Sequence, residues 1–174
     1  MIKMLIRPES TEYAKPFEPY IDRVPDGNVV DILKFHQQTT NEFLKSVPSA
    51  DWHKRYAEDK WNAKEVLGHM IDNEMNMLYR IFRITRGFED SLPFFEREKS
   101  IQHFEYDSIP VHRLIQYFWE TRQLMITTCE NVKDENWLNK GRLGDYVFSA
   151  RALVYVSAGH ELHHLEALKT KYFI

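Results

Sequence analysis

The stretch that most constrains the fold is WNAKEVLGHMIDNEMNMLYRIFRITRG, residues 61–87. Asn62 is a favourable N-cap residue, and Glu65 follows three positions later, as in a capping box. Trp61 and Val66 flank this cap as a hydrophobic staple would. Apolar residues then recur at helical spacing until Gly87, a residue type that commonly ends helices. The stretch therefore predicts an amphipathic helix from about 62 to 86.

Three other segments have the same helical periodicity, and they span about 28–46, 108–130 and 150–169. Four amphipathic helices of this length predict an all-α protein, a four-helix bundle with long interhelical loops. The loops, 47–61, 87–107 and 131–148, are long enough to allow a topology other than simple up-down-up-down. We expect one domain over residues 1–174.

The N-terminal residues 1–27 contain four prolines, which exclude a long helix, together with several aromatic and aliphatic residues. We expect an extended Pro-rich tail that packs on the bundle.

The composition is that of a soluble globular protein, with 43% hydrophobic and 28% charged residues. A net charge of -3 gives no basic surface for nucleic acid or for an anionic membrane, and no apolar run is long enough to span a membrane. Cys129 is the single cysteine, and the first residues are too short for a secretory signal, so we expect a cytoplasmic location. A small-molecule substrate and a homodimer are the partners we expect.

The segment His-Glu-Leu-His-His at 160–164 is the clearest chemical signal. His160 and His164 stand one helical turn apart within an apolar pattern, so both imidazoles can reach one metal ion. A third ligand must come from another helix, and His69 is the best placed of the remaining histidines. A hydrogen-bonded histidine cluster in the core is the alternative. Glu161 is a candidate catalytic residue that could orient a ligand or accept a proton, and its alternative is a solvated surface carboxylate.

His-Glu-x-x-His is also the zincin protease signature, in which a third ligand follows downstream. Only ten residues follow His164, and they include Glu166 but no histidine. The protease interpretation is therefore disfavoured.

Two carboxylates lie near His69 on its predicted helix. Glu65 precedes it by four residues and Asp72 follows it by three, so either could fix the tautomer of that ring. Helix-surface charges are the more common role of such residues.

Three arginines, at 80, 83 and 86, could bind an anion, but this spacing is more typical of a solvated helix face with ion pairs. Cys129 is expected to be a small buried hydrophobic residue. The aromatic segment 88–95 could cover a metal site as a lid or cap the end of the bundle.

Three segments, WNAKEVLGH at 61–69, YRIFRITRG at 79–87 and AGHELHHL at 158–165, together resemble the DinB-like superfamily. The resemblance implies a four-helix bundle in which three histidines bind a divalent metal with open coordination positions. The matching residues here are His69, His160 and His164. Members of that superfamily include thiol-dependent transferases and isomerases, and others are described as metal-dependent hydrolases.

The resemblance therefore implies an enzyme that uses zinc or nickel, with a low-molecular-weight thiol as a potential cosubstrate, for thiol transfer or hydrolysis of an electrophile. Two alternatives stay open. One is a metal-stabilised binding or interaction module without catalysis, and the other is an interaction protein without metal. An open coordination position beside a pocket indicates catalysis, whereas a fourth protein ligand indicates a structural site.

Overall fold

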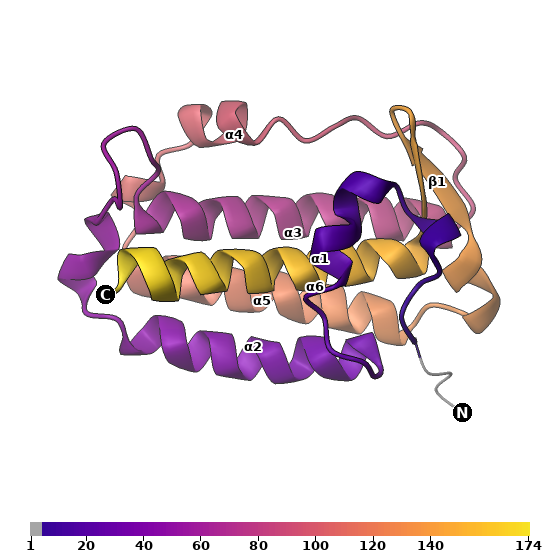
Figure 1. Cartoon of the computed structure of the whole chain (residues 1–174), viewed down its shortest axis with the longest axis horizontal. Helices are drawn as coiled ribbons and strands as arrows, with labels where there is room; N and C mark the ends of the chain where they lie inside the picture. Colours follow the sequence, from indigo (N-terminus) through magenta and orange to yellow (C-terminus); the bar gives the residue numbers. More distant parts are fainter. Residues whose placement is uncertain (1–4) are drawn as a thin grey trace.

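A computed structural model describes residues 5–174 and contains four long helices, shown in Figure 1. They are α2 (Val29–Ser46), α3 (Ala63–Thr85), α5 (Val111–Glu130) and α6 (Ala150–Ala167). The expected all-α four-helix bundle is confirmed. Shorter elements lie around it: α1 (Glu18–Ile21), α4 (Arg97–His103), β1 (Lys140–Leu143), β2 (Tyr146–Ser149), several 3-10 turns, and a π-helical end to α6 at Leu168–Tyr172.

The cap of α3 forms as predicted. The Asn62 side-chain oxygen accepts a hydrogen bond from the Glu65 backbone N–H at 2.9 Å, and the Glu65 carboxylate accepts one from the Asn62 N–H at 2.7 Å. The start of the third long helix differs from the prediction. Ile109 precedes a proline and is extended, so Tyr106–Ser108 form a separate 3-10 turn and α5 begins only at Val111.

The helix order is not up-down-up-down. Both α2 and α3 pack against α5 and α6. The first two long helices, α2 and α3, therefore occupy diagonally opposite corners of the bundle. Figure 1 shows α3 and α5 running in the same direction, because the connection between them returns along the outside of the bundle. Helix α4 lies within this crossover. The long loop after α3 therefore sets the topology.

A β-hairpin at the end of the bundle was not predicted. β1 and β2 pair antiparallel, with Lys140 opposite Ser149 and Leu143 opposite Tyr146. Gly144 has a φ of +58° in the turn, a conformation that glycine adopts at little cost. Strands of four residues are too short to give a recognisable alternation, which explains why 131–148 was expected to be loop.

The N-terminal segment packs on α6 as expected, but it is not extended throughout. Residues 10–12 and 15–17 form 3-10 turns and lead into α1, because a proline in the first turn costs no hydrogen bond. Gly159 on α6 makes the close packing possible, since a Cβ there would lie 1.8 Å from the Tyr20 carbonyl oxygen. Residues 1–4 of the expected tail lie outside the described part of the chain.

The buried core divides into two clusters, one on each half of the bundle. Leu33, Ile81 and Leu153 belong to the first, and Leu67, Ile71 and Phe118 belong to the second. Within residues 5–174, none of the helices has the length and apolar character that crossing a membrane requires.

Candidate metal centre

Three histidines from two helices meet between the two halves of the core. His69 comes from α3, and His160 and His164 come from successive turns of α6. The Nε2 atom of His160 lies 3.0 Å from that of His69 and 3.1 Å from that of His164. His69 and His160 are buried and His164 is half-buried. The structure therefore brings together the three residues that the sequence suggested.

Burial keeps these imidazoles in the neutral state. Desolvation is the main cause, and it lowers the pKa of His69 to about 4 and that of His164 to about 3. The pKa of His160 falls well below its usual value, because it is buried and adjoins the other two rings. Neutral imidazole is the form that binds metals. The cluster is thus in a metal-binding protonation state near neutral pH.

The donor set suits a divalent first-row metal. Two imidazole nitrogens that bind one zinc ion at about 2.0–2.1 Å lie at most about 4.2 Å apart. The Nε2 atom of His160 meets this limit with both other rings, and the ligand nitrogens of all three rings lie within 4.8 Å of one another. Within residues 5–174, the group contains three histidines and no carboxylate or thiol as a fourth ligand. Three protein ligands with a free position are typical of catalytic zinc sites, whereas structural sites have four.

Neither carboxylate expected near His69 contacts it. The Asp72 carboxylate accepts a hydrogen bond from Ser100 at 2.5 Å, and Glu65 caps α3 and pairs with Arg55 at 3.0 Å. The buried Nδ1 of His69 has no hydrogen-bond partner within the described chain. Neither acid therefore fixes the tautomer of His69, the role that was the less favoured of the two expectations, and both half-buried carboxylates instead bind residues outside α3.

Glu161 is buried, which makes the surface alternative wrong. One oxygen accepts a hydrogen bond from Thr40 at 2.7 Å and the other accepts one from Arg122 at 2.6 Å. These partners lie on α2 and α5, whereas His160 and His164 meet His69 of α3. Glu161 therefore belongs to a buried ionic network on another side of α6, with both carboxylate oxygens already hydrogen-bonded.

This network was missed by the sequence analysis. Arg122 is fully buried, and it also donates to Glu74 at 2.5 and 3.1 Å. Ser157 of α6 donates to the same Glu74 at 2.5 Å. The sequence did contain one indication that these residues are buried. Glu74 and Arg122 both stand at helical spacing within the apolar stripes of their helices. The network joins all four long helices.

Two cavities adjoin the histidine cluster. The larger, of about 430 Å³, is lined by His164 together with Trp61, Tyr172 and Lys171. The smaller, of about 160 Å³, is lined by His69 and His160. A small molecule can therefore approach the cluster from two sides.

The crossover contributes to the cover of the site. Phe95 stacks on the His69 ring, with 6.0 Å between ring centroids and 6° between ring planes. Phe94 packs instead against Tyr146 of the hairpin, at 5.8 Å, and Phe88 is exposed near the end of α3. Residues 88–95 were expected either to cover the metal site or to cap the end of the bundle. Phe95, at the C-terminal end of this segment, covers the histidine cluster.

The three arginines at 80, 83 and 86 were expected on a solvated helix face, and this expectation is wrong for Arg80. That side chain is buried, whereas Arg83 forms an ion pair with Asp90, and Arg86 is exposed. Cys129 is buried as expected, and desolvation raises the pKa of its thiol to about 12. The thiol is therefore not a nucleophile near neutral pH.

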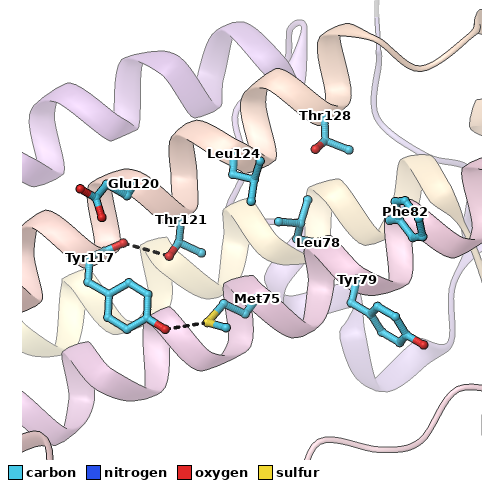
Figure 2. Close-up of a pocket in the computed structure, with 9 residues that line it drawn as sticks. All are labelled: Met75, Leu78, Tyr79, Phe82, Tyr117, Glu120, Thr121, Leu124 and Thr128. Carbon is cyan, nitrogen blue, oxygen red and sulfur yellow. Dashed lines mark hydrogen bonds between the residues drawn. The ribbon is translucent and has the colours of Figure 1, made fainter.

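A groove larger than either of these cavities lies away from the histidine cluster. It lies between α3 and α5, has a volume of about 540 Å³, and is drawn in Figure 2. Its lining is mostly apolar, including Met75, Phe82 and Leu124, and Glu120 is its one titratable carboxylate. The groove has no metal-binding histidine and no nucleophile suited to chemistry at neutral pH.

Comparison with known proteins agrees with this architecture. A sequence model of the DinB superfamily matches residues 32–168. The chain belongs to the DinB superfamily. A search among curated proteins finds no match.

Two solved structures share the fold of this DinB-superfamily chain. One is YfiT from Bacillus subtilis, described as a probable metal-dependent hydrolase with an unusual four-helix bundle topology. It has a TM-score of 0.71 and 10% identity, over 97% of this chain and 91% of YfiT. The other is a mycothiol-dependent maleylpyruvate isomerase, with a TM-score of 0.62 and 13% identity over 86% of this chain. The match spans 60% of the isomerase. At these identities the likeness establishes the fold and not the reaction.

Proposed function

We propose that this DinB-superfamily chain is a metal-dependent enzyme that uses zinc or nickel to activate a small thiol or water against an electrophilic substrate. The observation that carries the proposal is the convergence of His69, His160 and His164 at Nε2 separations of 3.0 and 3.1 Å. Three imidazole donors suit both metals. When bound, such an ion would lower the pKa of a thiol or water toward neutrality and polarise an electrophile.

The histidines supply neutral donors and leave the full charge of the ion for catalysis. The low pKa of each ring means that metal binding near pH 7 requires no loss of an imidazolium proton. The packing of α3 against α6 sets the spacing of the three rings. The chain therefore holds a preorganised ligand set.

The surrounding side chains limit access of water. Trp61 lies beside His69 with 5.2 Å between ring centroids, and Tyr20 of α1 lies 5.7 Å from the His160 ring. Phe95 covers the remaining face of His69. Substrates must enter through the cavities of about 430 and 160 Å³. Such enclosure strengthens electrostatic interactions at the reacting atoms.

The use of a thiol is supported by the shared fold with a mycothiol-dependent isomerase, and hydrolysis by the fold shared with YfiT. Thiol transfer is our leading proposal, since the cavity beside His164 has room for a small thiol next to an electrophile. We assign Glu161 no proton-transfer step, because Thr40 and Arg122 already occupy its oxygens. The alternative, a metal-stabilised binding module, has the same ligands but no turnover.

The test begins with purified protein loaded with zinc or nickel and measured by elemental analysis. Metal-loaded protein is then incubated with a panel of low-molecular-weight thiols and electrophiles, and loss of free thiol is followed. We expect turnover that requires both metal and His164. His164→Ala should lose it, while His112→Ala, a change of an exposed histidine at the start of α5, should keep it. Full metal occupancy without turnover for any thiol or water reaction would favour the binding module.

A further inference from the structure

Arg80 is a buried cation without a counter-ion. Its side chain is 5% exposed, and no carboxylate among residues 5–174 lies within ion-pair distance. The guanidinium has two polar contacts: it donates to the Pro93 carbonyl oxygen at 3.0 Å and approaches the Met77 sulfur at 3.8 Å. A guanidinium carries five N–H donors, so most of its hydrogen-bonding capacity is unused. A buried charge in this state is costly unless an anion joins it.

The position of Arg80 suggests where that anion binds. Arg80 lines the cavity of about 160 Å³ that also touches His69 and His160. Arg97, at the start of α4, lines the same cavity, and no aspartate or glutamate does. The single ion-pair partner of Arg97 in the described chain is the exposed Glu98, at 2.7 Å. The cavity therefore offers two guanidinium groups and no negative charge.

The remaining lining defines the kind of molecule that fits. Phe17, Tyr20, Phe94 and Phe95 form aromatic walls, and Asn73 adds a polar amide. A volume of about 160 Å³ admits only a small group. The planar, forked guanidinium matches a carboxylate, which it can bind through two parallel hydrogen bonds.

We propose that this cavity is the carboxylate-binding subsite of the enzyme, in which Arg80, assisted by Arg97, holds a carboxylate of the thiol or electrophile beside the histidine cluster. The inference rests on the proposed function and adds a substrate class, small carboxylic acids, to it. A purely structural role for Arg80, as an anchor of the crossover through Pro93, would use one donor and predicts no preference for anionic ligands.

The first arm of the test uses cobalt-loaded protein and two matched thiols, 3-mercaptopropionate and 3-mercapto-1-propanol. Thiolate binding is read from the thiolate-to-cobalt charge-transfer absorption. We expect half-saturation by the carboxylate thiol at a concentration about tenfold lower or more, because charge-assisted hydrogen bonds are the strong ones. Arg80→Gln should remove this preference and leave the affinity for the alcohol unchanged. Arg86→Gln, a change of an exposed arginine that directly follows the same helix, should retain it.

The second arm needs no metal. Binding of propionate and of 1-propanol to metal-free protein is measured by saturation-transfer NMR. Propionate should bind the wild type and Arg86→Gln but not Arg80→Gln. Circular dichroism checks the fold of each variant. If Arg80→Gln does not fold, Arg97→Gln, a change at an exposed position, takes its place and should weaken propionate binding.

The outcomes separate the two proposals. Absence of any charge-transfer band with either thiol, together with Arg80-dependent propionate binding, contradicts the proposed thiol chemistry and supports the subsite. The subsite is overturned if the two thiols saturate the wild-type protein at equal concentrations. It is also overturned if the preference for the carboxylate thiol survives in both Arg80→Gln and Arg97→Gln. Absence of propionate binding to the wild-type protein overturns it as well.

Discussion

The Nε2 atoms of His69 and His160 lie 3.0 Å apart, although 91 residues separate the two histidines in the chain. No local interaction can produce this contact, because it depends on how α3 packs against α6. His164 joins the pair because it stands one turn after His160 on the same helix face. The three rings form one cluster whose properties can be tested separately from any reaction.

Removal of one ring should remove metal binding. Wild-type protein dialysed against zinc or nickel is expected to retain about one equivalent, and His160→Ala much less, because two imidazoles are too few ligands for tight binding. Elemental analysis gives the occupancy. Bound metal should also raise the melting temperature of the wild type, since at 100 times Kd a ligand adds about 2.7 kcal/mol to the free energy of unfolding. His112→Ala should behave as the wild type, and full occupancy in His160→Ala would show that the site is misassigned.

Metal-free protein should lose stability as the pH falls from 7 to 5. The folded-state pKa values of His69, about 4, and His164, about 3, lie below the ordinary value of 6.5. In this range the unfolded chain binds more protons than the folded chain, so the free energy of unfolding rises with pH and levels off above about 6.5. The expected loss at pH 5 is on the order of 2 kcal/mol per imidazole.

Urea unfolding at pH 7, 6 and 5 in the presence of a chelator measures this loss. His69→Gln should reduce the pH dependence, and His112→Ala should not. A free energy of unfolding that stays constant between pH 7 and 5 contradicts the prediction.

Substitution of Arg122 should be strongly destabilising. Arg122→Met leaves the buried carboxylates of Glu74 and Glu161 without their shared cation, and loss of one partner from a buried ion pair costs about 3–5 kcal/mol. Urea denaturation compares it with Arg113→Met, a change at an exposed position of the same helix, which should be nearly neutral. Addition of Glu74→Gln and Glu161→Gln to Arg122→Met should recover part of the loss. A loss below about 1 kcal/mol would show that the network contributes little.

Alanine at position 159 should detach the N-terminal segment from α6. In an open helix Gly→Ala is stabilising by about 1 kcal/mol, but here the new Cβ would lie 1.8 Å from the Tyr20 carbonyl oxygen. We therefore expect a lower melting temperature and faster proteolysis around α1. Limited proteolysis with mass spectrometry locates the cuts. Equal protection of residues 18–21 in Gly159→Ala and wild type would contradict the close packing inferred here.

Local signals in the sequence were sufficient for the helices themselves. The reciprocal cap of Asn62 and Glu65 placed the start of α3, because both hydrogen bonds form within four residues. The spacing of His160 and His164 placed both rings on one face for the same local reason. The short helices α1 and α4, the four-residue strands of the hairpin and the exact start of α5 escaped the sequence analysis, since short segments carry too few residues to show a period.

The tertiary structure decided which polar side chains are buried and what they contact. Arg80 and Glu161 have sequence neighbours typical of a solvated helix face, yet the crossover covers the first and Arg122 of α5 binds the second. Helical periodicity specifies the direction of a side chain relative to its own helix, but not which neighbouring element lies in that direction. The chain by itself therefore determined four helices and the three candidate metal ligands, and the packing of those helices determined the histidine cluster, its cavities and the buried charges.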